Sequence, residues 1–157
     1  MQLQLVAVGK LRPALRSTCD DYLRRFGRFV PITEREVREA GRAATVASQR
    51  TEEGRRIIDA LDDSARVVIL DQGGEPWSSE MLAERLDGWR ADGRNTSLII
   101  GGAVGLGSAV ITRADLSWSL GPLTLPHELA RVVVAEQLYR SATILRGEPY
   151  HKPLRST

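Results

Sequence analysis

Short apolar runs rich in branched residues alternate along the chain with segments whose apolar residues recur at helical spacing. Residues 3–8, 66–71 and 97–100 have the continuous apolar character of strands that are covered on both faces. Residues 116–120 alternate like a strand, and a further strand is expected within 29–37. Because strands alternate with helices, we expect an α/β fold built on a parallel sheet.

The intervening helices are predicted from the spacing of their apolar residues. The first is centred on residues 15–26, where Ser17 or Thr18 is available as an N-cap. Residues 43–61 predict a second helix, whose first part is polar, and residues 79–89 predict a third.

A strongly apolar helix is expected after Pro126, which suits a first helical turn because proline has no N–H to leave unpaired. Glu128 lies near the positive end of that helix's dipole. Apolar stripes at 129, 132 and 133 and at 134, 138 and 142 cover two faces, so the helix needs two partners. One is the sheet, and the second could be the same helix of another subunit in a symmetric homodimer.

Length and composition narrow the class of protein. The 157 residues, 42% of them hydrophobic, suit one domain over 1–157 with an apolar core. The N-terminal apolar run is too short for a secretion signal, and no stretch has the roughly 20 apolar residues of a membrane span. The single cysteine, Cys19, excludes an internal disulfide and a thiolate metal cluster. We therefore expect a soluble cytoplasmic protein that binds no metal.

Basic residues gather in two parts of the chain, although the net charge is only +2 and the isoelectric point about 9.0. Such a balance permits a polyanionic partner without requiring one, and ordinary solvated faces explain the charges equally well. The C-terminal group has Arg140, Arg146, Lys152 and Arg155 against Glu148, and the other has Lys10, Arg12, Arg24, Arg25 and Arg28.

Two glycine-containing segments follow predicted strands. Residues 72–74, Gln-Gly-Gly, predict a turn, and residues 101–107 place four glycines at the carboxyl end of a strand, where open α/β sheets bind ligands. The second segment lacks the G-x-G-x-x-G fingerprint of dinucleotide sites and the lysine of a Walker A loop. Gly107-Ser108 also lacks the flanking residues of a hydrolase nucleophile elbow. A tight turn without a ligand remains the alternative.

Ordered motifs extend through nearly the whole chain, and together they are far more specific than any single one. They are LQLVAVG at 3–9, YLRRF at 22–26, LD at 70–71, GEPWSS at 74–79, LIIGG at 98–102, WSL at 118–120, LTLPH at 123–127, EQLYR at 136–140 and YH at 150–151. In these motifs the chain resembles the ribosomal large-subunit pseudouridine-N3 methyltransferase family, within the SPOUT superfamily of knotted methyltransferases.

This resemblance implies a trefoil-knotted parallel sheet that acts as a homodimer, although knots are otherwise nearly absent from proteins. It also implies that S-adenosylmethionine binds among three loops. Leucines and backbone groups suit the flat, mostly apolar adenine ring, and glycines let the backbone approach it closely. The expected loop residues are Leu70; Gly101, Gly102 and Gly105; and Gly121, Pro122, Leu123, Thr124, Leu125 and Pro126.

The implied reaction is displacement at the sulfonium methyl by N3 of a pseudouridine in 23S rRNA of the assembled large subunit or ribosome. N3 must lose a proton, so a base or a group that stabilises the deprotonated ring is expected. Tyr150 and His151 are the candidates, with Arg140 orienting the base or its phosphate. For His151 the alternative is a solvated tail residue, and for His127 a helix cap is the favoured role.

Arg24, Arg25 and Lys152 are expected to contact the RNA. Two positions depart from the family pattern. Val104 stands where an acidic residue usually precedes the third glycine of the loop, and Lys152 stands where arginine usually follows the Tyr-His pair, which keeps the charge but loses the bidentate fork. Two alternatives therefore stay open: a knotted methyltransferase that acts on tRNA, and a ribosome-binding module whose catalysis is impaired by Val104.

Overall fold

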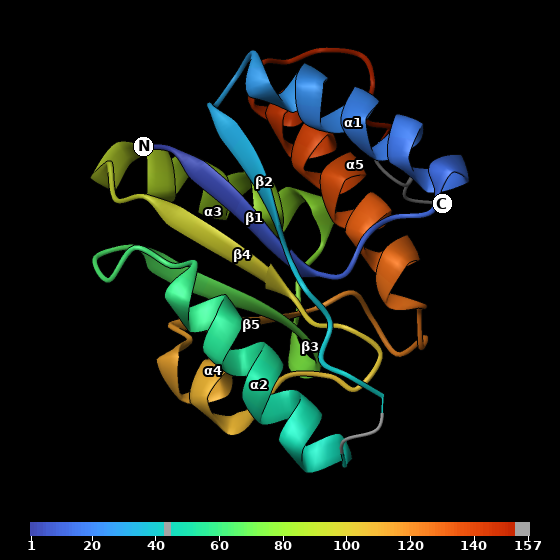
Figure 1. The fold of residues 1–157 in the computed structure, drawn as a ribbon. Coiled ribbons are helices and arrows are strands. Elements are labelled where there is room, and N and C mark those ends of the chain that lie inside the picture. Colours follow the sequence, from blue (N-terminus) through green and yellow to red (C-terminus); the bar gives the residue numbers. More distant parts are fainter. Residues whose placement is uncertain (43–44, 153–157) are drawn as a thin grey trace.

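A five-stranded parallel sheet forms the centre of the structure, a computed structural model that describes residues 1–42 and 45–152. The described residues also form five helices, of which four connect successive strands and one follows the last strand (Figure 1). In chain order the elements are β1 (Leu3–Val8), α1 (Pro13–Gly27), β2 (Ile32–Val37), α2 (Val46–Asp59), β3 (Arg66–Pro76), α3 (Ser79–Asp92), β4 (Thr96–Ile100), α4 (Ser108–Arg113), β5 (Leu116–Ser119) and α5 (His127–Leu145).

The strands lie in the order β2-β1-β4-β3-β5, and each neighbouring pair is parallel. The register places Leu5 of β1 beside Glu34 of β2 on one side and Leu98 of β4 on the other. This arrangement confirms the predicted α/β fold with a parallel sheet. It is also consistent with the trefoil knot that the family resemblance implies.

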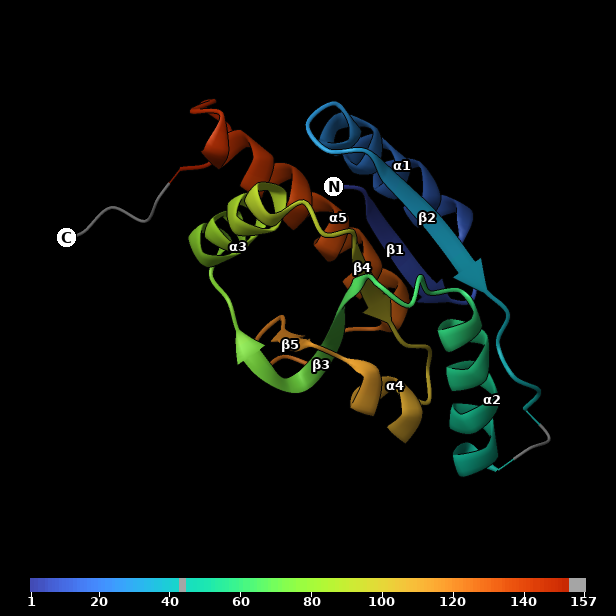
Figure 2. The ribbon, with the colours of Figure 1, turned by 90° about the vertical axis from the view of Figure 1, so that its left-hand side faces the viewer.

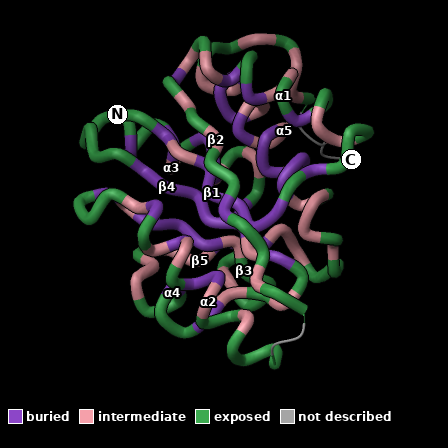
Figure 3. Tube along the Cα trace, viewed as in Figure 1, coloured by how far each residue is buried: buried purple, intermediate pink, exposed green. Residues whose placement is uncertain are grey.

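Helices cover both faces of the sheet, which explains why its strands are apolar on both sides. Helices α1, α3 and α5 pack on one face, and α2 and α4 pack on the other (Figures 1 and 2). Alternate residues of β1 belong to different cores: Leu5 and Ala7 join the α1, α3 and α5 side, whereas Val6 and Val8 join the α2 and α4 side. Figure 3 shows the buried positions running along the central strands and into α5.

Helix α1 begins one turn earlier than the sequence predicted. Its N-cap is Arg12, and Pro13 occupies the first helical position, so the predicted cap at Ser17 or Thr18 is wrong. Proline suits this position because its fixed φ is already helical and its missing N–H leaves no donor unpaired. The Arg12 N–H, just outside the helix, donates instead to Glu128 Oε1 at 2.6 Å.

Three other features differ from the sequence prediction: the start of one helix, one turn and one short helix. Helix α2 is capped by the Thr45 side chain, which accepts a hydrogen bond from the Ser48 N–H; the predicted start at Ala43 lies outside the described residues. The expected turn at 72–74 is instead part of β3, where the pairing with β5 shifts register between Leu70 and Glu75 and Gly74 lies close to Ser117. The short α4 was not predicted at all.

Helix α5 has the extensive apolar surface that its sequence predicted. Pro126 is its N-cap rather than its first residue, and Val134, Ala135 and Leu138 are fully buried. No helix in the described part of the chain is long and apolar enough to cross a membrane.

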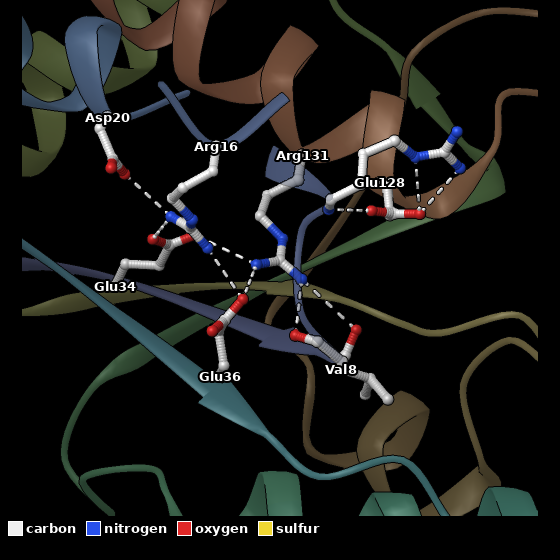
Figure 4. A network of polar contacts seen from close by, with 9 residues as sticks. Val8, Arg16, Asp20, Glu34, Glu36, Glu128 and Arg131 are labelled. Atoms are coloured by element: carbon white, nitrogen blue, oxygen red, sulfur yellow. Dashed lines mark hydrogen bonds and ion pairs between the residues drawn. The ribbon is translucent and has the colours of Figure 1, made fainter. Parts of the chain in front are cut away.

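A buried arginine ties α5 to the edge of the sheet. Arg131, 1% exposed, donates from Nη1 to Glu34 at 3.2 Å and to Glu36 at 2.6 Å, both on β2. Its Nη2 donates to the carbonyl oxygens of Val8 and Gly9 at the end of β1 (Figure 4). Arg16 of α1 pairs with the same two glutamates. The network therefore joins α1, α5, β1 and β2.

We expect Arg131→Met to lower the free energy of unfolding by about 3–5 kcal/mol, because it leaves two buried carbonyls without their donor and leaves the two glutamates with Arg16 as their remaining partner. Urea unfolding followed by circular dichroism at fixed protein concentration measures this change. Arg55→Ala is the control, since Arg55 pairs with Glu52 and Asp59 on the surface of α2 and its loss should cost far less. Equal losses for the two variants would contradict the structural role of Arg131.

Candidate functional site

A cavity of about 220 Å³ opens at the carboxyl ends of β3, β4 and β5. This volume far exceeds the roughly 10–15 Å³ that holds one buried water molecule, so the cavity is of ligand size and is not a packing defect. Ligands bind at this edge in open parallel sheets. The lining residues are Leu70, Asp71, Gln72, Ile100, Gly101, Gly102, Gly105, Leu106, Trp118, Leu120, Gly121, Leu123, Thr124, Leu125, His127 and Ala130.

Most residues predicted to hold the cofactor meet in this cavity. Pro122 and Pro126 are not among its lining residues. Their places are structural: the Pro122 carbonyl accepts a hydrogen bond from the Gln72 side chain at 3.3 Å, and Pro126 precedes α5. The predicted residues that do line the wall are Leu70, Gly101, Gly102, Gly105, Gly121, Leu123, Thr124 and Leu125.

The glycine loop at 101–107 is held closely against its surroundings. The Gly105 N–H donates to the Gly102 carbonyl at 3.1 Å, which closes a narrow turn. An added Cβ on Gly102 would lie 2.9 Å from Val8 Cγ1, so only glycine allows this approach. From the side of α2, Arg50 Nε donates to the Val104 carbonyl. The loop is therefore fixed through its backbone, and the Val104 side chain takes no part in that bond.

The loop that follows β5 forms the opposite wall. Gly121 has a φ of +112°, a conformation that residues with side chains rarely adopt. The Ser119 hydroxyl accepts a hydrogen bond from the Gly121 N–H at 3.1 Å. The Gln72 side chain lies 3.4 Å from Thr124 Oγ1, which links this loop to the end of β3.

The chemistry of the wall suits a ligand with a flat apolar part and a positive charge. Leucine side chains and Trp118 supply apolar surface, and the glycines bring backbone N–H and C=O groups to it. Asp71 and His127 are the only ionisable residues among those that line the cavity. A single carboxylate beside apolar surface favours a cation. An adenosyl sulfonium compound has both properties, so the residues present fit S-adenosylmethionine.

The residues predicted to act on the substrate form a second cluster, on α5 and the segment after it. Glu136 accepts hydrogen bonds from the Tyr150 hydroxyl at 2.9 Å and from Arg140 Nη2 at 2.8 Å. His151 lies between Arg140 Nη1, 3.3 Å from its Nδ1, and Glu80 Oε1, 2.9 Å from its Nε2. Since arginine only donates, Nδ1 accepts, and Nε2 then carries the proton and donates to Glu80.

The surroundings of the Tyr150 cluster determine the protonation states of Tyr150 and Glu80. Burial, together with hydrogen bonds to Tyr22 and Glu136, raises the pKa of Tyr150 well above its ordinary value. Tyr150 therefore stays protonated at neutral pH and acts as a hydrogen-bond donor, not as a base. A backbone hydrogen bond and the bond from His151 lower the pKa of Glu80, which keeps it ionised opposite the imidazole.

The cavity and the Tyr150 cluster lie apart within one chain. His127, at the start of α5, lines the cavity, whereas the Tyr150 hydroxyl binds Glu136, nine residues further along the same helix. At 1.5 Å per residue this separates them by about 13 Å along the helix axis. The structure thus groups the predicted residues into two sites and does not bring them together.

One of the residues predicted to bind RNA adjoins the Tyr150 cluster. The Arg25 guanidinium lies over the Tyr139 ring at 5.6 Å, and Tyr139 packs edge-on against Tyr150 with ring centroids 4.8 Å apart. Arg24, further round α1, pairs with Asp21, and Lys152 is exposed. Arg25 therefore lies beside the Tyr150 cluster, whereas contact of Arg24, Arg25 and Lys152 with RNA stays a prediction.

Several residues of both groups were missed from the sequence. Asp71 and Gln72 directly follow Leu70 at the end of the predicted strand, so their position could have identified them. Glu136 and Glu80 form the centre of the second cluster. The i,i+4 spacing of Glu136 and Arg140 on one helix could have identified Glu136. The contact of Glu80 with His151 joins residues 71 positions apart in the chain, and no local pattern marks it.

Comparison with known proteins identifies relatives along the whole chain. Residues 1–151 match the family described as "Predicted SPOUT methyltransferase". The protein named "Ribosomal RNA large subunit methyltransferase H" from Anaeromyxobacter sp. (strain Fw109-5) is 45% identical over 153 residues, which cover 97% of this chain and 100% of the relative. The protein of the same name from Xanthomonas campestris pv. campestris (strain B100) is 43% identical, with 97% and 99% covered.

Solved structures show the same fold at much lower identity. A methylase family protein from Neisseria gonorrhoeae superposes with a TM-score of 0.59 and 12% identity, covering 99% of this chain and 88% of that one. A protein described as a probable methyltransferase from Bordetella pertussis Tohama I gives a TM-score of 0.55 and 15% identity, with 90% and 96% covered.

We expect Gly102→Ala to destabilise the protein by about 1–3 kcal/mol, because its methyl group would collide with the stiff Val8 side chain. Gly88→Ala on α3 is the matched control: nothing lies within 4 Å of its added Cβ, so it should stabilise the helix by about 0.5–1 kcal/mol. Urea denaturation of both variants measures the difference. Similar shifts in the two would show that the loop tolerates a side chain at 102.

Proposed function

This chain belongs to the SPOUT methyltransferase family, and we propose that it uses S-adenosylmethionine to methylate N3 of a pseudouridine in 23S rRNA of the large ribosomal subunit. The observation that carries the proposal is the cavity where three loops meet at the carboxyl ends of β3, β4 and β5. The names of the relatives, which specify large-subunit ribosomal RNA, support the substrate class.

The cavity residues would hold the methyl donor in a fixed position. Leu70, Leu123 and Leu125 would enclose the adenine ring, and Asp71 would lie near the positive charge. When bound, S-adenosylmethionine supplies an electrophilic methyl group. The protein's contribution is then to align the target nitrogen with that methyl group and to keep water out.

The Tyr150 cluster would handle the proton of the target base. His151 accepts at Nδ1, so a substrate N–H that displaces Arg140 from this nitrogen could transfer its proton there. Glu80 would stabilise the resulting imidazolium through Nε2, as a carboxylate does beside a catalytic histidine. Arg140 and the protonated Tyr150 would then donate hydrogen bonds to the negatively charged base.

The only cysteine does not supply a covalent nucleophile, which is compatible with transfer to nitrogen. Burial raises the pKa of the Cys19 thiol to about 11, so it is protonated at neutral pH and is no nucleophile. Transfer to nitrogen requires no covalent bond between the enzyme and the substrate, and no thiolate is needed.

A homodimer would bring the two groups of residues together. Each chain holds the cavity at the start of α5 and the Tyr150 cluster further along it. Leu123 is 75% exposed at the rim of the cavity, and Leu129 on the first turn of α5 is also exposed. Apolar surface at this position suits a second subunit, whose C-terminal segment would complete the site.

The two alternative functions differ in the RNA or in catalysis. A tRNA substrate would need no change to the cavity. A ribosome-binding module without catalysis would require that Val104 disable the glycine loop. The Arg50 bond to the Val104 carbonyl counts against that alternative, because any residue at 104 presents the same carbonyl.

The proposed activity predicts methyl transfer from labelled S-adenosylmethionine to 23S rRNA in large subunits or ribosomes from a strain that lacks this protein. Protein-free 23S rRNA and tRNA should accept little label. We expect His151→Ala to lower kcat by about 10²- to 10⁴-fold, the usual contribution of a general base. Label in tRNA would favour the first alternative, and cofactor binding without transfer to any RNA would favour the second.

If each active site combines the cavity of one subunit with the C-terminal segment of the other, two inactive variants should complement each other. Thr124→Trp should block the cavity without disturbing the core, because Thr124 is exposed, and His151→Ala removes the proposed base. A heterodimer has one intact cavity facing one intact C-terminal segment. Random pairing in an equal mixture should then restore roughly a quarter of wild-type activity. Activity no greater than the sum of the separate variants would place each site within a single chain.

A further inference from the structure

A buried carboxylate lies directly behind the glycine loop. Glu53, on α2, is only 5% exposed, and its Oε2 accepts a hydrogen bond of 3.2 Å from the Ala40 N–H. Its Oε1 is buried and has no hydrogen-bond partner among the residues that the structure describes. Each oxygen of a carboxylate is an acceptor, so one side of this group is unused.

The unused oxygen faces the backbone of the loop. An added Cβ on Gly102 would come within 3.3 Å of Glu53 Oε1. Gly102 lines the cavity and Glu53 does not, so the carboxylate approaches the loop from the side of α2. One turn earlier on this helix, Arg50 already donates to the Val104 carbonyl. Helix α2 therefore presents one engaged donor and one unused acceptor to the same loop.

The loop can satisfy this oxygen only through its main chain. Residues 101–105 are Gly, Gly, Ala, Val and Gly, and none of these has a side-chain donor. Their backbone N–H groups are the donors that the loop can offer. A buried carboxylate oxygen without a donor is rare, because it has lost its hydration and gained nothing in return.

We propose that Glu53 is a positioning residue of the methyl-donor site, whose Oε1 accepts a backbone N–H of residues 101–104 when a ligand fills the cavity; the Gly105 N–H already donates to the Gly102 carbonyl. The inference rests on the proposed function, since it assumes that this cavity binds S-adenosylmethionine. The bond forms only in the bound state. It therefore adds to ligand affinity and contributes nothing to the stability of the free protein.

Glu53→Gln tests this assignment, with Glu52→Gln as the matched control. Glutamine keeps an acceptor for the Ala40 N–H but presents an NH₂ group where Oε1 was, which opposes an N–H instead of accepting it. Glu52 is the preceding residue and pairs with arginines of α2 on the surface. Calorimetric titration of the full-length wild type and both variants with S-adenosylmethionine gives the affinities.

We expect Glu53→Gln to weaken binding about tenfold and to raise KM with little change in kcat. Its Tm without ligand should not fall below that of the wild type, because no hydrogen bond is lost in the free protein and an unpaired buried oxygen is removed. Hydrogen exchange of the amides at 101–104 should slow on binding in the wild type and in Glu52→Gln, but much less in Glu53→Gln.

Three results would overturn the assignment, and they can be told apart. Binding of S-adenosylmethionine by Glu53→Gln within twofold of the wild type would show that Oε1 makes no such bond. A fall in the Tm of Glu53→Gln well beyond that of Glu52→Gln would assign Glu53 to the fold of the free protein. Failure of the wild type itself to bind S-adenosylmethionine would reject the proposed function, and this inference with it.

Discussion

The buried Arg131 guanidinium is the interaction on which the geometry of both sites depends. A buried cation must be paired, and the groups that satisfy Arg131 come from two places: the glutamates of the edge strand β2 and the carbonyls at the end of β1. Arg16 of α1 shares the glutamates. Arg131 lies one turn into α5, so the same contacts fix where that helix begins. The loop after β5 ends at this point, and Val8, whose carbonyl Arg131 binds, packs against Gly102. Changes at Arg131 would therefore reach two walls of the cavity.

Helix α5 then links the cavity to the Tyr150 cluster. Its first turn borders the cavity, and Glu136 and Arg140 hold Tyr150 and His151 further along. Because the helix is rigid, His127 stays about 13 Å from Glu136 along the axis, and Ala130, which also lines the cavity, stays about 9 Å from it. No loop movement at the cavity can close that gap within one chain. The proposed homodimer would close the gap by bringing the C-terminal segment of a second subunit to the cavity.

The sequence predicted what depends on local pattern and missed what depends on packing. Continuous apolar runs predicted the buried strands and the last helix. Glycines at strand ends predicted the loops around Gly101 and Gly121. The family motifs identified S-adenosylmethionine as the expected ligand, whereas the spacing of the glycines alone did not. The N-cap at Ser17 or Thr18 was wrong because Pro13 sets the start of α1, and the turn at 72–74 was wrong because these residues are part of β3, where Gly74 lies close to Ser117. Neither Glu53 nor Glu80 could be found, since the contacts of each are with residues far away in the chain.

The structure changes how the departure from the family pattern at Val104 is interpreted. In the sequence it is a missing carboxylate beside the ligand. In the structure the loop is fixed by atoms that every residue type possesses: the Gly102 carbonyl accepts from the Gly105 N–H, and the Val104 carbonyl accepts from Arg50. What the loop cannot tolerate is side-chain bulk at Gly102, where the space is already filled by Val8 and Glu53. Steric room at the glycines therefore constrains this site more strongly than the charge at position 104, and α2 behind the loop supplies polar groups that the loop itself lacks.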